Sequence, residues 1–250
     1  MIAVTSLGDD VFVLRLLSRQ IEVYNARTFT LQRHVTFSTV GCHRYLCGLA
    51  ACARYKCLYV SDSDDSVHRT QLSRFNVAMK WSVASGPRGL SVNKAHNVVV
   101  ACYGAYKLLE YTTHGALVRE ISLQQAGVTR PWHAVQLSTG DYVVTYGTSP
   151  GAVIVVGVDG QVVCRYDPSH VGQMRYPRSV AVTKNDDILI IDLGNNRILS
   201  MNSSLSSVRA LVLPVDSAIQ KPWGLCLDES RRRLYVNDGG GCRVLVFKSV

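Results

Sequence analysis

Four residues that could bind an anion or an apolar group occupy one recurring position of the sequence. Each directly follows a proline, and the successive prolines lie 44, 46 and 45 residues apart. The four residues are Arg88, Trp132, Arg178 and Trp223. Cations interleaved with aromatic rings suit phosphates and unstacked bases, or acidic peptides with an apolar anchor. We therefore predict that these four residues, together with His133, form a ligand-binding surface.

The elements that must position these residues are short strands. The clearest unit spans residues 177–201, where apolar runs at Val180–Val182, Ile188–Ile191 and Ile198–Met201 alternate with polar turns. The runs are too short and too β-branched for helices. Self-similarity at this period indicates a repeat architecture. The six copies cover residues 1–40, 41–85, 86–129, 130–175, 176–220 and 221–250.

The number of strands in each repeat predicts the fold class. The first repeat has four strand candidates, Ile2–Thr5, Val11–Leu14, Ile21–Tyr24 and Phe29–Val35. The last repeat has only three, Leu225–Leu227, Leu234–Val236 and Val244–Phe247. We predict an all-β, six-bladed β-propeller of four-stranded antiparallel blades, forming a single domain over residues 1–250, whose last blade lacks its outer strand. We expect the missing strand to lie before Met1 or after Val250, and flanking sequence to raise the melting temperature.

Strand alternation also predicts which face carries the site. The turn before the first strand and the turn between the second and third strands lie on one face, because each strand reverses direction. Tyr103 is expected on this face, but farther from the channel. In the alternative interpretation, Trp132 and Trp223 cover the core between blades while Arg88 and Arg178 are solvated.

The repeat unit resembles a known family. A Pro–x–Gly–apolar start, an apolar strand ending in Asp, and an Asn–x–Arg–apolar element resemble the NHL repeat over nearly the whole chain. Repeat five matches best, through Pro177, Asp192, Asn195 and Arg197, whereas repeats one, three and four lack the Asp. NHL propellers include RNA-binding and protein-binding modules of tripartite-motif ubiquitin ligases. Related six-bladed folds include amidating lyases and lactonases.

The Asp–x–x–Asn–x–Arg element is predicted to be structural. Asp192 ends one strand and Arg197 begins the next, so their charges can pair across the hairpin. Asp238 and Arg243 have the same spacing in the last repeat. We expect both pairs to fix the turn and the register of the strands.

Four cysteines recur at every fifth position: Cys42, Cys47, Cys52 and Cys57. Zinc ligands usually come in closer Cys–x2–4–Cys pairs, so this spacing is a weak zinc signal. Cys52 and Cys57 flank a turn and could form a disulfide in an oxidising compartment. We predict reduced thiols, with no metal and no cofactor.

Enzyme motifs are scarce. Residues 147–151 read Gly–x–Ser–x–Gly, but they lie between two strands rather than in the strand–turn–helix context of a nucleophile elbow. Amidating lyases place zinc-binding histidines directly after the proline that opens a blade, where this sequence has Arg or Trp. We therefore predict no catalytic residues. The alternative is a lactonase-like or amidating-lyase-like hydrolase or lyase that uses the central channel.

Composition limits the partners. Lys and Arg number 27 against 18 Asp and Glu, a net charge of +9 that permits an anionic partner. No apolar stretch approaches the length of a membrane span, and residues 1–17 lack the basic head and unbroken apolar core of a signal peptide. We expect a cytoplasmic protein that does not bind membranes, either a monomer or part of a larger multidomain protein. The predicted function is a non-enzymatic scaffold that binds single-stranded RNA or a protein segment.

Overall fold

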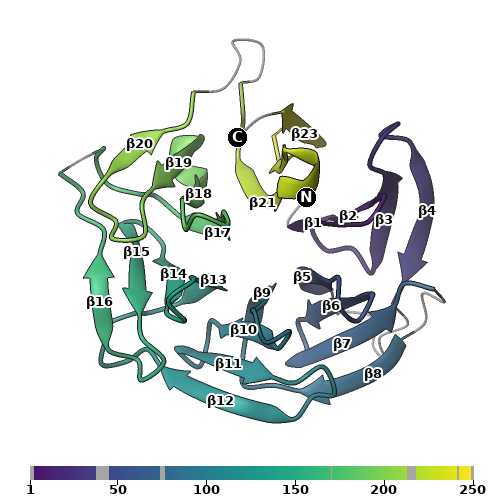
Figure 1. Cartoon of the computed structure of the whole chain (residues 1–250), viewed down its shortest axis with the longest axis horizontal. Helices are drawn as coiled ribbons and strands as arrows, with labels where there is room; N and C mark the ends of the chain where they lie inside the picture. Colours follow the sequence, from purple (N-terminus) through teal and green to yellow (C-terminus); the bar gives the residue numbers. More distant parts are fainter. Residues whose placement is uncertain are drawn as a thin grey trace.

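Antiparallel sheets form a ring, with the first strand of each sheet on the inside (Figure 1). The computed structural model describes residues 3–37, 45–73, 77–169, 171–212, 218–240 and 242–248. Over these residues there are six sheets, five with four strands and one with three. The six-bladed β-propeller predicted from the sequence is therefore confirmed, including the missing outer strand of the last blade.

The first three blades follow the repeat boundaries. Blade one contains β1 (Ala3–Leu7), β2 (Asp10–Leu14), β3 (Gln20–Asn25) and β4 (Leu31–Thr36). Blade two contains β5 (Leu46–Cys52), β6 (Cys57–Asp62), β7 (Ser66–Gln71) and β8 (Val77–Ser82). Blade three contains β9 (Pro87–Val92), β10 (Val98–Cys102), β11 (Lys107–Tyr111) and β12 (Leu117–Ser122).

The last three blades repeat this order until the final strand. Blade four contains β13 (Pro131–Gln136), β14 (Tyr142–Gly147), β15 (Gly151–Val156) and β16 (Val162–Arg165). Blade five contains β17 (Pro177–Val182), β18 (Ile188–Asp192), β19 (Arg197–Met201) and β20 (Val208–Ala210). Blade six contains only β21 (Pro222–Asp228), β22 (Arg233–Asp238) and β23 (Arg243–Lys248).

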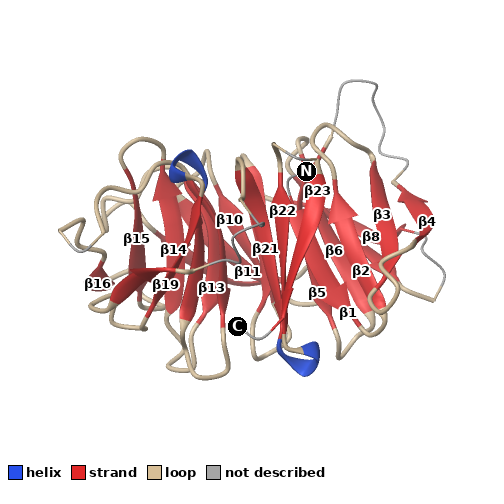
Figure 2. Ribbon diagram, turned by 90° about the horizontal axis from the view of Figure 1, so that it is seen from above, coloured by secondary structure: helices blue, strands red, loops and turns tan. Residues whose placement is uncertain are grey.

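Two single-turn 3-10 helices mark the two faces of the ring. η1 (Leu193–Asn195) joins the second and third strands of blade five, whereas η2 (Glu229–Arg231) joins the first and second strands of blade six. Figure 2 shows them at opposite ends of the strands, as alternating strand direction requires. In the described part of the chain, no helix has the length and apolar character needed to cross a bilayer.

The predicted start of the fourth strand of blade one is wrong. The sequence predicts that the fourth strand of blade one begins at Phe29, but β4 begins at Leu31. Asn25 Oδ1 accepts hydrogen bonds from the backbone N–H groups of Arg27 and Thr28, which closes a side-chain-stabilised turn. Phe29 then takes a left-handed conformation with φ of 58° and cannot pair as a strand residue.

Apolar clusters between neighbouring blades form the core. Between blades three and four, Leu108 packs with Tyr142 and Ile154, and all three are almost fully buried. Burying one such side chain stabilises the fold by about 1.5–3 kcal/mol. The ring closes where Tyr235 of blade six joins Val11 of blade one in a further cluster.

The Asp–x–x–Asn–x–Arg element ties turns to strands. Asp192 is fully buried, and its carboxylate accepts hydrogen bonds from Arg197 Nε at 2.7 Å and Asn195 Nδ2 at 2.8 Å. Its other oxygen accepts the backbone N–H of Arg175. The geometry is that of the structural tie predicted from the sequence. Asp238 makes the same pair with Arg243 at 3.0 Å.

Candidate binding site

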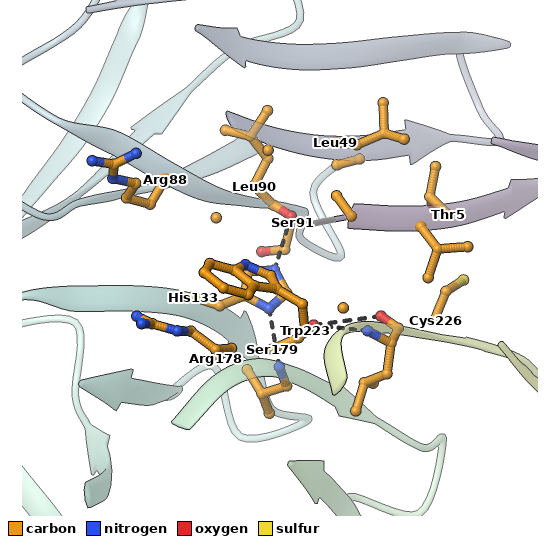
Figure 3. Close-up of a pocket in the computed structure, with 18 of the residues that line it drawn as sticks. Thr5, Leu49, Arg88, Leu90, Ser91, His133, Arg178, Ser179, Trp223 and Cys226 are labelled. Carbon is orange, nitrogen blue, oxygen red and sulfur yellow. Dashed lines mark hydrogen bonds between the residues drawn. The ribbon is translucent and has the colours of Figure 1, made fainter. Parts of the chain in front are cut away.

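A repeated irregularity carries the predicted residues to the channel mouth. In β9, β13, β17 and β21 the strand register shifts just after the opening proline. Such a bulge takes a residue out of the hydrogen-bonded ladder and re-aims its side chain. All four residues consequently line one cavity of about 450 Å³ on the axis of the ring (Figure 3). They are Arg88, Trp132, Arg178 and Trp223.

The cations and rings at the mouth are stacked on one another. Arg178 Cζ lies 3.4 Å from the ring centroid of Trp132 and 4.8 Å from that of Trp223. Arg88 Cζ lies 5.8 Å from the same Trp132 ring and 5.5 Å from the ring of Tyr103. Tyr103 meets Trp132 edge-on, with centroids 4.8 Å apart, so it packs in the stack instead of farther out. These distances fall within the range of cation–π attraction.

Neither arginine of the stack is neutralised by a carboxylate of the described residues. Nε and Nη1 of Arg178 and Nε of Arg88 are buried and have no hydrogen-bond partner there. The contact of Arg88 Nη1 is with the thiol sulfur of Cys47, at 3.6 Å. The pKa of Arg178 is lowered to about 10, chiefly by desolvation and also by the nearby charge of Arg88. Arg178 therefore remains cationic at neutral pH, and the mouth carries two adjacent guanidinium groups.

Both tryptophans belong to the framework as well as to the cavity wall. Trp132 Nε1 donates to the carbonyl oxygen of Gly147 at 3.0 Å. Trp223 packs against the apolar cluster between blades one and two, which includes Phe12 and Leu46. For Trp223 the packing expected in the alternative interpretation is therefore present, and both indoles line the cavity and contact Arg178.

His133 lies in the cavity wall but has no free ring nitrogen. Its Nδ1 accepts the backbone N–H of Val180 at 3.1 Å, so the hydrogen on Nε2 is donated to the carbonyl of Leu90 at 2.9 Å (Figure 3). Burial lowers the pKa of His133 and favours this neutral form. The ring therefore links the inner strands of blades three, four and five. Its predicted role as a ligand-binding residue would require one of these bonds to break.

Two leucines at the mouth were not among the predicted site residues. Leu16 and Leu17 lie in the turn between β2 and β3, line the same cavity, and are 55% and 66% exposed. Exposed apolar side chains beside unpaired cations offer an anchor for a ligand that is partly apolar. Leu17 stands where repeat five has Gly194, which was a signal available in the sequence.

Deeper in the channel the wall is apolar with a few small polar groups. Thr5, Ser91, Ser179 and Cys226 contribute these groups, and the residues that line the cavity include no Asp or Glu. Over the described ranges, no three His, Cys, Asp or Glu residues gather as a metal site would require.

The cysteine series does not come together at one point. Cys52 and Cys57 face each other across β5 and β6, and both are free thiols. Cys47 lies apart from them at the channel mouth, and Cys42 falls outside the described residues. The Gly–x–Ser–x–Gly stretch forms the turn between β14 and β15, as its position between two strand candidates indicates.

Comparison with known proteins identifies relatives only by structure. No known protein family matches the sequence, and no curated protein does. Hydrazine synthase from Kuenenia stuttgartiensis superposes with a TM-score of 0.73 at 15% identity, over 99% of this chain and 95% of that one. Virginiamycin B lyase from Staphylococcus aureus gives 0.67 at 11% identity, over 99% and 83%. The structure of a nidogen/laminin complex gives 0.67 at 14% identity, over 96% and 94%.

These similarities show the fold. Identities of 11–15% say nothing about shared chemistry, because one propeller fold supports unrelated functions. Among the three, one is named as a lyase and one comes from a protein complex. Membership of the NHL family remains a prediction from the repeat pattern.

Proposed function

We propose that the protein is a non-enzymatic interaction module that binds an acidic protein segment at the channel mouth. The observation that carries this proposal is the pair Arg88 and Arg178: Nε of Arg88 and both Nε and Nη1 of Arg178 are buried and lack a partner among the described residues. A buried donor without a partner costs about 1–3 kcal/mol. A ligand carboxylate that accepts these hydrogen bonds would recover that cost and could do so in a bidentate arrangement.

The arrangement of the stack favours a protein segment over single-stranded RNA. Bases bind such surfaces by stacking on open aromatic faces. Here the guanidinium of Arg178 already lies over Trp132 and Trp223, so a base would have to displace it. The exposed Leu16 and Leu17 add an apolar contact that suits a peptide side chain. The similar fold in the nidogen/laminin complex supports the use of a propeller in binding protein.

Binding of three synthetic probes tests this function. The probes are a short peptide of alternating glutamate and leucine, the same peptide with glutamine for glutamate, and oligouridylate. We expect the acidic peptide to bind, which calorimetry and the fluorescence of Trp132 and Trp223 would report. Loss of one charge-assisted hydrogen bond costs about 1.5–3 kcal/mol, so the glutamine peptide should bind at least about tenfold more weakly. The double variant R88Q/R178Q should show a similar loss.

The matched control removes two charges from the opposite face. Arg54 and Arg232 are exposed and lie in turns between first and second strands. Their neighbour Arg231 is unsuitable, because its Nη2 pairs with Asp9 Oδ1 at 2.6 Å across the junction of blades six and one. We expect R54Q/R232Q to bind the acidic peptide normally. An equal loss of peptide binding in the two double variants would show nonspecific charge attraction. Binding of oligouridylate without binding of the acidic peptide would indicate RNA, and not a protein segment, as the ligand.

A further inference from the structure

The cavity on the ring axis extends well below the arginine pair. Its wall contains residues of all six innermost strands, β1, β5, β9, β13, β17 and β21. On β17 the wall runs from Arg178, beside the opening proline, to Val182, the last residue of the strand. Five successive residues of an extended strand span about 13 Å. The contacts assigned above to an acidic segment concern only the mouth of this space.

The size and lining of the cavity are those of a small-molecule site. Pockets for small ligands commonly enclose about 300–1,000 Å³ and have mostly apolar walls with a few polar groups. This cavity encloses about 450 Å³. Below the arginines its wall includes Leu49, Leu90 and Leu225, and the first two are labelled in Figure 3. An apolar group that entered the cavity would therefore lie against apolar side chains.

The ionisable groups of the wall are unevenly placed. Among the described residues that line the cavity there is no Asp, Glu or Lys, and the two Arg are Arg88 and Arg178. Both directly follow the proline that opens their strand, so both lie at the mouth. The buried nitrogens Nε of Arg88 and Nε and Nη1 of Arg178 lack a partner in the described structure. The cavity is thus basic at its mouth and largely apolar below it.

We propose that this cavity binds a small amphipathic anion, whose head group pairs with Arg88 and Arg178 and whose apolar chain lies along the inner strands. Guanidinium groups form strong charge-assisted hydrogen bonds with carboxylates and phosphates. Burial of the chain against the wall below would add a hydrophobic contribution that grows with chain length. The inference shares the arginine pair with the proposed function but needs no protein ligand, so each can fail alone.

Straight-chain carboxylates of increasing length are the probes. Calorimetry with the whole chain would compare butanoate, hexanoate and octanoate. We expect the affinity to rise by up to about fourfold for each added methylene, because each is buried in the cavity. Octanol has the chain without the charge and should bind at least about tenfold more weakly than octanoate. Octyl phosphate tests the other head group, and tighter binding than octanoate would assign a phosphate to the arginines.

Two double variants test the head-group contact. R88Q/R178Q should weaken octanoate by at least about tenfold, because it removes both charges from the mouth. R54Q/R232Q, which removes two charges from the opposite face, should bind octanoate as the wild type does.

A substitution below the mouth tests the chain contact. Ala181 lines the cavity three positions beyond Arg178, so A181F would place a phenyl ring in the space for the apolar chain. Loss of contact with two methylenes would weaken octanoate by more than about tenfold. The acidic peptide should bind A181F normally, since the arginines are unchanged. The matched control is A210F, which makes the same exchange at an exposed position on the outer strand of the same blade.

Three results would overturn the inference. They are absence of octanoate binding, an affinity that does not depend on chain length, and equal binding of octanoate to A181F and wild type. If A181F fails to fold or loses both ligands, the chain-length series on the wild type decides. Binding of octanoate without the acidic peptide would refute only the proposed protein ligand, whereas binding of the peptide without octanoate would refute only this inference.

Discussion

The charged groups of the turns and those of the channel mouth belong to the same repeats but have opposite surroundings. Asp192 is fully buried and accepts three hydrogen bonds, including one from Arg197 at 2.7 Å. Arg88 and Arg178 lie beside aromatic rings with buried nitrogens that no described residue satisfies. The first arrangement pairs charge within the blade, whereas the second leaves charge without a carboxylate partner among the described residues.

The two sets of charged residues are therefore expected to differ in role: the turn pairs stabilise the fold, and the arginines of the channel mouth are proposed to bind a ligand. A buried charge that loses its partner is strongly destabilising, so the turn pairs are expected to be intolerant of change. A buried cation without a partner lowers the stability of the folded protein, a cost that is common at sites whose residues serve a function. The predictions that follow test this separation.

Replacing Asp192 with Asn should have the largest effect. The new amide nitrogen would face the donors Arg197 Nε and Asn195 Nδ2, which now meet a carboxylate oxygen. We expect the free energy of unfolding to fall by about 3 kcal/mol, as for a broken buried pair. Denaturant titration would measure it.

Asp159 provides the control for that change. It is exposed, and its contact is with the backbone N–H of Gln161 in a surface turn, a hydrogen bond that Asn can also accept. We expect D159N to change stability by less than about 0.5 kcal/mol. If D192N and D159N changed stability equally little, Asp192 would not stabilise the turn. The contrast between the turn pairs and the channel mouth would then fail.

Replacing His133 with Gln should have an intermediate effect that depends on pH. His133 is neutral when folded, and burial holds its pKa below the usual value of 6.5. Below pH 6.5 the unfolded chain takes up a proton that the folded ring does not, so wild-type stability falls as pH decreases toward the lowered pKa. One such group contributes at most about 1.4 kcal/mol per pH unit.

The wild-type and H133Q proteins should therefore differ most above pH 6.5. Their difference in unfolding free energy, measured from pH 7.5 down to 5.5, is expected to shrink, because Gln carries no proton. A difference that stays constant across this range would mean that the folded ring titrates as it does in the unfolded chain. That result would contradict the conclusion that the folded protein holds His133 in its neutral form between blades three and five.

Replacing Arg178 with Met should have the smallest effect on stability and the opposite sign. The change removes a desolvated charge but keeps a long side chain that can pack on Trp132 and Trp223. We expect the free energy of unfolding to stay level or rise by up to about 1 kcal/mol, while binding of the acidic peptide is lost. A fall of more than about 1 kcal/mol would show that the cation–π stack serves the fold.

The sequence was informative wherever structure depends on local pattern. Short apolar runs separated by polar turns determined the number of blades and the place of the three-stranded one. Pairing of Asp192 with Arg197 could be predicted because the two residues flank one hairpin. The exception, Phe29, depended on hydrogen bonds from Asn25 that compete with the strand.

The site was less accessible to sequence reasoning because it joins residues from different blades. The common position of Arg88, Trp132, Arg178 and Trp223 could be found from the period. The way in which these side chains stack on one another could not be predicted, because it depends on the bulge after each proline and on the distance between blades. The bonds of His133 to blades three and five have the same long-range origin.

The spacing of the inner strands has a consequence for how such a protein can evolve. A Cβ atom on Gly89 would lie 2.5 Å from Trp132 O and 2.5 Å from His133 Cδ2, so neighbouring inner strands are in backbone contact there. The width of the channel is therefore set by the main chain, while the residues beside each proline project from it. Substitution at those positions can change the side chains that the mouth presents without changing its aperture, so a ring of fixed width can carry chemically different mouths after a few exchanges.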